Sequence, residues 1–512
     1  MFAKTKTYLK LNKRFTVLST VAALAVLVTA CATPAAPAAP AAPAATAAPA
    51  ATEAPKATEA PAATEAPKAT EAPKATEAPK ATEAPAMAAG DAKDFVTWYQ
   101  YDAANEDPKN DERVGNAYLR ETMPIFNKAY TGKWNWVNQT QPFDKMSTNL
   151  VAAVQAGGEV PDLMQAGTGD LNLFLKNGAV QDITDWAKAQ SWFANLDPAA
   201  VATCTVDGKL YCIPVAESPQ VVFYWTAHFP NGFPKNPADF LKDAEALKAK
   251  KVKAITFFGS TAFDGGGIGR FINTVFKSYG GKFDDGAGKM LLNTPENIKT
   301  IEFLREIVSK GYVTDESFQG TSTPFIEEEP MKTAIAASFP TGIFGYRYVN
   351  PLKAPSGKEY ATKTEQDMLD AIAAGDVAVG PFFADEGKKP GCDTASSSFI
   401  ISKGAKNIEA AHDYINWIMS PEQNAKWVQG PGGGFPALRT TLTEKTFATP
   451  FYKQAAAATA ASTCAPWYGS LDRRQEAQKI IMSAVYKLMK EDTKADIAAT
   501  LKTAEEEYNK GG

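Results

Sequence analysis

The residues that could carry catalysis are few and scattered along the chain. Its 512 residues include two histidines, His228 and His412, and neither has a partner at the spacing of a metal site or a catalytic triad. The glycine-rich segment 265–270 ends in arginine where a dinucleotide-binding loop has glycine. We interpret the glutamates 327–329 as a solvated face. These patterns weaken the case for an enzyme and predict neither a metal nor a cofactor, although composition alone leaves glycoside hydrolysis by paired carboxylates open.

The first cysteine follows a secretory leader. Basic residues precede an uncharged stretch, residues 15–30, that is too short for a comfortable membrane span. This pattern predicts a signal peptide over residues 1–30. The sequence Val28-Thr29-Ala30-Cys31 resembles the bacterial lipobox, which implies that Cys31 becomes the lipidated first residue of the mature protein.

The other four cysteines are expected to form two disulfides, because exported proteins meet an oxidising compartment. Cys204 and Cys212 flank residues 206–209, which carry a hairpin turn signal, so a cross-strand bridge between them is favoured. Cys392 with Cys464 follows by elimination only. Three connectivities remain possible in principle.

Residues 31–90 are predicted to be a disordered tether. After Cys31 they consist almost entirely of Ala, Pro, Thr, Glu and Lys, with six copies of the hexapeptide A-T-E-A-P-K or A-T-E-A-P-A over residues 51–86. Such a segment has no aromatic side chain to build a core and is extended where it is polyproline-like. Without the five basic residues of the leader, 48 basic side chains face 57 acidic ones, which argues against nucleic acid or an anionic bilayer as partner.

About 420 residues follow the tether, enough for two domains. Strand and helix patterns alternate there, which indicates βαβ units and a mainly parallel sheet. The clearest predicted elements are strands at 95–99 and 134–137, helices at 111–130 and 143–156, helix starts at Asn236-Pro237 and Thr294-Pro295, and a helix pair over 408–428 broken at Ser420-Pro421.

Five segments, in order along the chain, resemble motifs of family 1 extracellular solute-binding proteins, relatives of the maltose-binding protein. They are Ala156 to Leu163 (A-G-G-E-V-P-D-L), Gly178 to Thr184 (G-A-V-Q-D-I-T), Val206 to Pro214 (V-D-G-K-L-Y-C-I-P), Ile400 to Lys403 (I-I-S-K) and Phe435 to Arg439 (F-P-A-L-R). Two features depart from the family pattern. Cys212 replaces the usual glycine, which suits a disulfide, and residues 225–236 are irregular.

The resemblance implies an α/β, two-lobe periplasmic-binding-protein type II fold with the ligand in an interlobe cleft. Mapped by motif order, the chain should cross between lobes near 216–220 and again near 393–398. The first lobe would comprise 91–217 with 398–440, and the second 218–397 with 441–512.

The family resemblance also implies a function, the capture of a mono- or oligosaccharide for the permease of an ABC importer. The candidate ligand-binding residues are aromatic or polar side chains at expected cleft positions, namely Tyr101, Asp102, Thr168, Asp170, Glu217, Tyr224, Trp225, Arg270, Phe344, Tyr346, Trp467 and Tyr468. Core packing or helix capping is the alternative for each of them. Trp225 is equally suited to packing beneath the hinge, and Thr168 to capping the helix that follows it.

Other ligands and classes stay open. A polyol phosphate, a polyamine or a metal chelate is the first alternative, and a surface carbohydrate-active enzyme or adhesin is the second. Among the candidates, Arg270 is the only basic residue, which is few for an anionic ligand. We expect a monomer on the outer face of the cell membrane, held there by its lipid anchor.

Overall fold

The computed structural model describes residues 92–107, 110, 113–143, 145–261, 267–319 and 326–511. All of them fall within one compact unit, Thr82–Gly512. The predicted signal peptide, the lipidated Cys31 and the tether of residues 31–90 lie outside the described residues. Within the described part of the chain, no helix combines the length and the apolar character needed to cross a bilayer.

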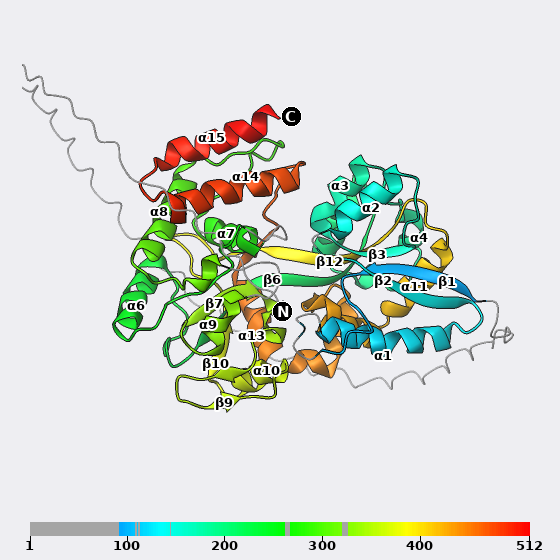
Figure 1. Cartoon of the computed structure of the whole chain (residues 1–512), viewed down its shortest axis with the longest axis horizontal. Helices are drawn as coiled ribbons and strands as arrows, with labels where there is room; N and C mark the ends of the chain where they lie inside the picture. The colour runs from blue at the N-terminus through cyan, green and yellow to red at the C-terminus, as the bar shows by residue number, and fades with distance from the viewer. Residues whose placement is uncertain are drawn as a thin grey trace, which may run out of the picture. The chain divides into compact units, whose positions relative to one another are not determined.

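One large sheet runs through the structure. Its strands are β1 (Lys93–Tyr99), β2 (Trp134–Thr140), β3 (Leu163–Gly167), β6 (Ile213–Trp225), β7 (Ser338–Gly342), β10 (Val377–Gly380), β12 (Thr394–Ile401) and β13 (Phe435–Pro436). Their order is β10-β6-β12-β3-β1-β2, with β7 and β13 also paired to β6 (Figure 1). β1 is parallel to β2 and β3, as the alternation of strands and helices predicted. The pairings of β12 with β3 and β6, and of β6 with β7, β10 and β13, are antiparallel, so the prediction of a mainly parallel sheet was wrong for the rest of the sheet.

Three smaller strand pairs stand apart from this sheet. They are β4 (Thr205–Val206) with β5 (Lys209–Leu210), β8 (Leu352–Lys353) with β9 (Glu359–Tyr360), and β11 (Gly391–Cys392) with β14 (Thr463–Cys464). β4 and β5 form the predicted hairpin, whose turn residues Asp207 and Gly208 both have positive φ.

The helices agree with the start signals in the sequence. The α-helices are α1 (Arg113–Ala129), α2 (Met146–Gln155), α3 (Leu171–Lys176), α4 (Thr184–Lys188), α5 (Pro198–Thr203), α6 (Pro237–Ala249), α7 (Gly267–Ser278), α8 (Pro295–Ser309), α9 (Glu329–Lys332), α10 (Gln366–Ala373), α11 (Ile408–Ile418), α12 (Pro421–Trp427), α13 (Pro450–Ala461), α14 (Arg474–Tyr486) and α15 (Ile497–Lys510). Asn236 and Thr294 cap α6 and α8 by accepting a backbone N–H, each just before a proline. The predicted break between α11 and α12 at Ser420-Pro421 is confirmed.

β6 belongs to both halves of the sheet, and Asp393, directly before β12, joins β12 to the second half through the N–H of Gln220. Residues 213–219 of β6 pair with β12 and β13, whereas residues 220–225 pair with β7 and β10. We call β6 and β12 the crossover strands. The first lobe is β1, β2, β3 and β13 with α1, α2, α11, α12 and their connections, and the second lobe is β7 and β10 with α6, α7, α8, α14, α15 and theirs.

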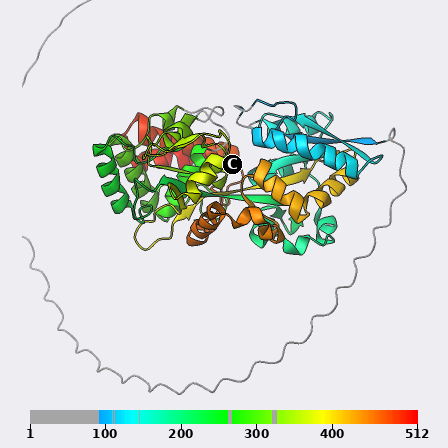
Figure 2. The ribbon, with the colours of Figure 1, turned by 90° about the horizontal axis from the view of Figure 1, so that it is seen from below.

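The second lobe has its own hydrophobic cluster. Buried residues of α6, α7, α8, α14 and α15 pack together there, among them Phe240, Phe271, Ile301, Ile481 and Leu501. The red C-terminal helices accordingly lie on the green elements of this lobe in the views of Figures 1 and 2. This cluster fixes the start of α14, which carries part of the candidate site.

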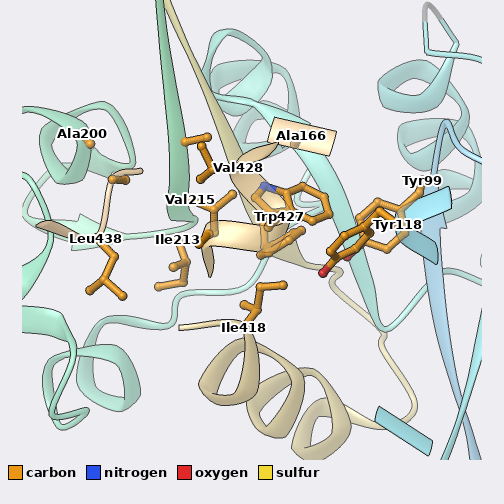
Figure 3. Close-up of a cluster of buried hydrophobic side chains, with 14 of the residues drawn as sticks. Tyr99, Tyr118, Ala166, Ala200, Ile213, Val215, Ile418, Trp427, Val428 and Leu438 are labelled. Atoms are coloured by element: carbon orange, nitrogen blue, oxygen red, sulfur yellow. The ribbon is translucent and has the colours of Figure 1, made fainter. Parts of the chain in front are cut away.

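The first lobe is built around aromatic rings (Figure 3). The ring of Trp427 at the end of α12 lies 5.5 Å from Tyr99 of β1, 5.4 Å from Tyr118 of α1 and 4.9 Å from Phe399 of β12. Trp427 is fully buried. The aromatic contacts therefore tie a crossover strand to the helices of this lobe, and they fix the start of the segment that follows α12.

Candidate functional site

Segments of both lobes meet beside the crossover strands, and we call this region the junction. From the first lobe come η1 (Thr168–Asp170), a short helix directly after β3, and η6 (Val428–Gly432), directly after α12. From the second lobe come η5 (Ile343–Arg347), directly after β7, the segment 465–470 and the start of α14. Seven of the candidate ligand residues lie here, namely Thr168, Asp170, Glu217, Arg270, Phe344, Trp467 and Tyr468.

Tyr468 and Arg474 of the second lobe contact η1 of the first. Nη1 of Arg474 donates to the carbonyl oxygens of Thr168, at 3.1 Å, and Gly169, at 2.6 Å. The guanidinium carbon of Arg474 lies 3.7 Å from the centroid of the Tyr468 ring, in a cation–π arrangement. Burial raises the pKa of Tyr468, while the Arg474 charge and a hydrogen bond with Thr168 act against that rise. Thr168 is thus held by the second lobe, beyond any capping role.

Asp170 stands at the end of η1, behind this contact. The hydroxyl of Ser147 in α2 donates to its Oδ2 at 2.7 Å. Burial raises the pKa of the Asp170 carboxyl, and the Ser147 hydrogen bond and the Arg474 charge oppose the shift. The carboxylate is therefore fixed in place by α2 and lies near a cation of the other lobe.

Glu217 lies in the middle of β6, where it pairs with β12 and β13. Its carboxylate accepts hydrogen bonds from the hydroxyls of Ser396 and, at 3.4 Å, Thr394. Burial raises the pKa of Glu217 to about 7, against these hydrogen bonds. A carboxyl group on the crossover strands can thus act as donor or acceptor near neutral pH.

Arg270 and Asp393 form an ion pair at the other end of the crossover. Nε of Arg270 in α7 lies 2.7 Å from Oδ2 of Asp393, just before β12, and the Arg270 guanidinium also donates to the carbonyl of Ser218. Asn273 donates to the second carboxylate oxygen of Asp393 at 2.7 Å. Burial raises the pKa of Asp393, and Arg270 and Asn273 oppose that rise. The half-buried ring of Phe344 lies 5.4 Å from the Arg270 guanidinium.

A disulfide fixes the segment that carries Trp467 and Tyr468. Cys392 of β11 is bonded to Cys464 of β14, next to Asp393, and the second disulfide of the structure joins Cys204 to Cys212. Asn273 also donates to the carbonyl of Ala465 at 3.0 Å. The Trp467 ring, half-buried, lies 5.8 Å from that of Tyr468. Two aromatic side chains are thus held beside the ion pair.

A glycine run of the first lobe contacts Arg347 on the opposite side of the crossover strands. Nη1 of Arg347 in η5 donates to the carbonyl of Gly430. A Cβ on Gly434 would lie 2.1 Å from the carbonyl oxygen of Glu217, and Gly433 has φ +58°. Side chains at these two positions would therefore displace the first lobe from the junction.

Of the remaining five candidates, Tyr346 belongs to η5 and Tyr101 contacts η6, but both are buried, and the other three lie away from the junction. Trp225 is fully buried and its indole N–H donates to the carbonyl of Met331 at 3.0 Å, so its predicted contact with ligand does not agree with this position. Tyr346 and Tyr101 are also buried, and their hydroxyls donate to carbonyls of η6. Tyr224 packs on the rings of Phe229 and Phe233. Asp102 is exposed and caps a turn through the N–H of Ala104.

The interpretation of the glutamate run as a solvated face was wrong for Glu327 and Glu328, whereas Glu329 is exposed. Glu327 and Glu328 are 2% and 3% exposed, because η4 (Ile326–Glu328) is drawn inward where the hydroxyl of Thr256 donates to the Glu327 carbonyl at 2.7 Å. Burial raises the pKa of Glu327 to about 7. Over the described residues, no three His, Cys, Asp or Glu side chains are grouped in a way that could hold a metal ion. His412 instead stacks on Trp186, with ring centroids 3.9 Å apart.

Sequence reasoning missed Arg474 and the partnership of Asp393 with Arg270. Arg474 directly follows another arginine, Arg473, and nothing in the local sequence separates the two. Asp393 fell within a predicted crossover segment, but its partner is 123 residues away in the chain. The signal that could have pointed to Arg474 was the presence of two arginines shortly after the segment that carries Trp467.

Comparisons of the sequence with known proteins indicate one family of solute-binding proteins. The model of the family described as "Bacterial extracellular solute-binding protein" matches residues 110–425. A curated relative, the arabinooligosaccharide-binding protein of Bacillus subtilis, is 22% identical over 313 residues, which cover 60% of this chain and 67% of the relative.

Solved structures are similar over most of the chain. Maltose-bound MalE3 of T. maritima has a TM-score of 0.64 at 14% identity and covers 81% of this chain and 99% of its own. An ABC-transporter solute-binding protein of Thermotoga lettingae bound to α-D-tagatose has a TM-score of 0.65 at 19% identity, and the match covers 82% of this chain and 99% of that structure. Another such protein, from Agrobacterium radiobacter K84 in complex with ribitol, has a TM-score of 0.62 at 20% identity, and the match covers 83% of this chain and 99% of that structure. These likenesses confirm the predicted α/β, two-lobe binding-protein fold.

Proposed function

Because this chain belongs to the family of bacterial extracellular solute-binding proteins, we propose that it binds a neutral carbohydrate at the junction and delivers it to the permease of an ABC importer. The family and its solved relatives are solute-binding proteins and not enzymes. The candidate ligand residues are the seven that lie at the junction.

The pairing of buried charges at the junction carries this proposal. Arg270 is neutralised by Asp393 at 2.7 Å, and the Arg474 charge acts on Asp170. Glu217, with a pKa of about 7, is only partly charged near neutral pH. A phosphorylated ligand would be bound best by basic side chains that are not already paired within the protein. A polyamine would be bound best by carboxylates that are not already paired. Balanced charges instead suit a ligand without charge.

The other groups at the junction suit the hydroxyls and the C–H faces of a sugar. Hydroxyl and carboxyl groups are present in Thr168, Glu217 and Asp170. The rings of Phe344, Trp467 and Tyr468 are half-buried, so part of each stays accessible for stacking. The ligands named for the relatives, an arabinooligosaccharide, maltose, tagatose and ribitol, are all uncharged polyhydroxylated molecules and support this choice.

A thermal-unfolding screen tests the ligand class. Mono- and oligosaccharides and sugar alcohols form one panel, and sorbitol 6-phosphate, spermidine and ferric citrate form the other. A neutral ligand at 100 times its dissociation constant should add about 2.7 kcal/mol to the unfolding free energy. Stabilisation by members of the charged panel alone would contradict the proposal and favour one of the alternative solutes.

We propose further that the protein is a monomer anchored by a lipid on Cys31 and spaced from the bilayer by the tether. The proposed lobe boundaries remain 91–217 with 398–440 and 218–397 with 441–512. Labelling of growing cells with radioactive palmitate tests the anchor. The full chain should take up label and Cys31→Ala should not, whereas equal labelling of both or no labelling of the full chain would contradict lipidation at Cys31.

A further inference from the structure

Arg474 is the side chain that joins candidate ligand residues of both lobes. It begins α14 in the second lobe, and its Nη1 donates to two carbonyl oxygens of η1 in the first, those of Thr168 and Gly169. Its guanidinium covers the ring of Tyr468, and its charge acts on Asp170. Arg474 therefore acts on Thr168, Tyr468 and Asp170 at once, in addition to the hydrogen bond between Tyr468 and Thr168.

The preceding residue provides an internal comparison. The Arg473 guanidinium carbon lies 4.2 Å from the centroid of the Tyr508 ring, and its nitrogens donate to the Tyr508 carbonyl and to Glu476. Tyr508 belongs to α15 and Glu476 to α14, so all these partners are in the second lobe. The two arginines make the same kinds of contact, with a tyrosine ring and a backbone carbonyl, but the hydrogen bonds of Arg474 reach the other lobe and those described for Arg473 stay within its own.

The Arg474 contact lies at one edge of the crossover strands. The two crossover strands lie side by side. The outer neighbour of β12 is β3, and an outer neighbour of β6 is β13. Arg474 contacts η1, which follows β3, while Arg347 contacts η6, which precedes β13. The lobes are thus connected on both edges of the crossover pair. Arg474 makes the contact at one edge, and at the other Arg347 donates to the Gly430 carbonyl while Arg113 of the first lobe donates to the Arg347 carbonyl at 2.7 Å.

We propose that Arg474 is a positioning residue that holds the lobes together in the ligand-free protein and so assembles the binding site before ligand arrives. Backbone carbonyls are permanent acceptors, so the contact does not depend on which solute is bound. The apparent dissociation constant of a two-state binder is the intrinsic constant divided by the competent fraction. Loss of Arg474 should therefore weaken every ligand by the same factor.

This inference rests on the proposed function only in identifying the assembled junction with the ligand site. Its test needs no ligand and can fail separately. Spin labels are placed on the full chain at two exposed positions, Lys188 of the first lobe and Lys250 of the second, through an unnatural ketone amino acid that leaves the four disulfide cysteines untouched. Pulsed electron paramagnetic resonance then gives the distribution of distances between the labels.

The variants are Arg474→Met, Arg474→Lys and the matched control Arg473→Met. Without ligand, the parent and Arg473→Met should share one principal distance. Arg474→Met should gain a second population at a different distance between the labels. In Arg474→Lys this second population should be smaller, because an ammonium carries a charge but cannot stack flat on Tyr468 or donate in two directions as a guanidinium does. If Arg474→Met does not fold, Arg474→Lys decides the question. An unchanged distribution in the folded Arg474 variants, or an equal change in Arg473→Met, overturns the proposal.

Discussion

The Nε of Arg270 lies 2.7 Å from Oδ2 of Asp393, and Asp393 is 1% exposed. The first experiment concerns this pair. Asp393→Asn leaves a partly buried guanidinium without its carboxylate, and breaking a buried pair in this way costs about 3–5 kcal/mol of unfolding free energy. Urea unfolding measures the loss. Asp385→Asn is the control, because its partner Lys299 is 56% exposed and such pairs contribute about 0–1 kcal/mol. Equal losses would contradict the assignment of Arg270 and Asp393 as a buried pair.

The pH dependence of stability should have a component from two buried glutamates. The folded-state pKa of Glu217 and of Glu327 is raised to about 7, from 4.5. Between these values the folded protein binds more protons than the unfolded chain at these two sites, so their contribution to stability is largest below pH 4.5 and is lost as the pH rises through 7. Glu217→Gln and Glu327→Gln should each reduce this fall, by an amount on the order of 1–3 kcal/mol. Urea midpoints at pH 5 and pH 8 measure it.

The two glutamates should differ in their effect on ligand binding. Glu217 lies at the junction and Glu327 does not, so the pH dependence of affinity for a sugar identified in the screen should change in Glu217→Gln and stay as in the parent in Glu327→Gln. Titration calorimetry at the same two pH values provides the comparison. The same pH profile of affinity in all three proteins would remove Glu217 from the site.

Removal of the two disulfides should have different effects. The Cys392–Cys464 bond closes a separation of 72 residues and the Cys204–Cys212 bond one of 8. The loop-entropy relation gives about 4 kcal/mol for the first and about 2.5 kcal/mol for the second. Replacing both cysteines of a pair with serine, followed by urea unfolding, tests this order.

The same serine variants test how the Trp467 segment is positioned. β14 precedes this segment directly, and Ala465 is hydrogen-bonded to the Cys392 carbonyl. Sugar affinity should therefore fall in the Cys392/Cys464 variant and be unchanged in the Cys204/Cys212 variant. Equal affinities would show that the β11–β14 pairing alone holds the segment.

Trp467 and Trp225 form a matched pair of tryptophans. Trp467→Ala removes a half-buried ring at the junction and should weaken sugar binding by about 1–3 kcal/mol, or about ten- to a hundredfold. Trp225→Ala empties a buried core position and should lower stability by about 3–5 kcal/mol while the folded fraction binds normally. Calorimetric titration and a melting curve of each variant separate the two effects. Unchanged affinity in Trp467→Ala would refute its stacking role.

Local signals were sufficient for much of the fold. Asn236 and Thr294, each before a proline, mark helix starts through interactions that span three residues, and the structure has both caps. The turn at residues 206–209 is equally local. The alternation of apolar strands with helices predicted parallel β1, β2 and β3, because that arrangement buries both faces of a sheet.

The candidate site depends on contacts between distant residues and was predicted less well. Trp225 and Trp467 are both tryptophans near the end of a strand, but Met331 provides a carbonyl for the first and not the second, and no spacing reveals this. Three consecutive glutamates ordinarily favour solvent, and the burial of Glu327 follows from tertiary packing against Thr256. Arg474 is distinguished from Arg473 by a segment about 305 residues earlier in the chain.

The position of β12 also sets the order in which the protein can mature. β12 lies between β3 and β6, yet it is synthesised after both, and β13 follows later still. Until residues 394–401 have emerged, the apolar edges of β3 and β6 have no strand between them, and the first lobe stays incomplete although most of its sequence comes first. The first lobe therefore depends on pairing between strands that are far apart in the chain, and such late, long-range strand pairing is slow.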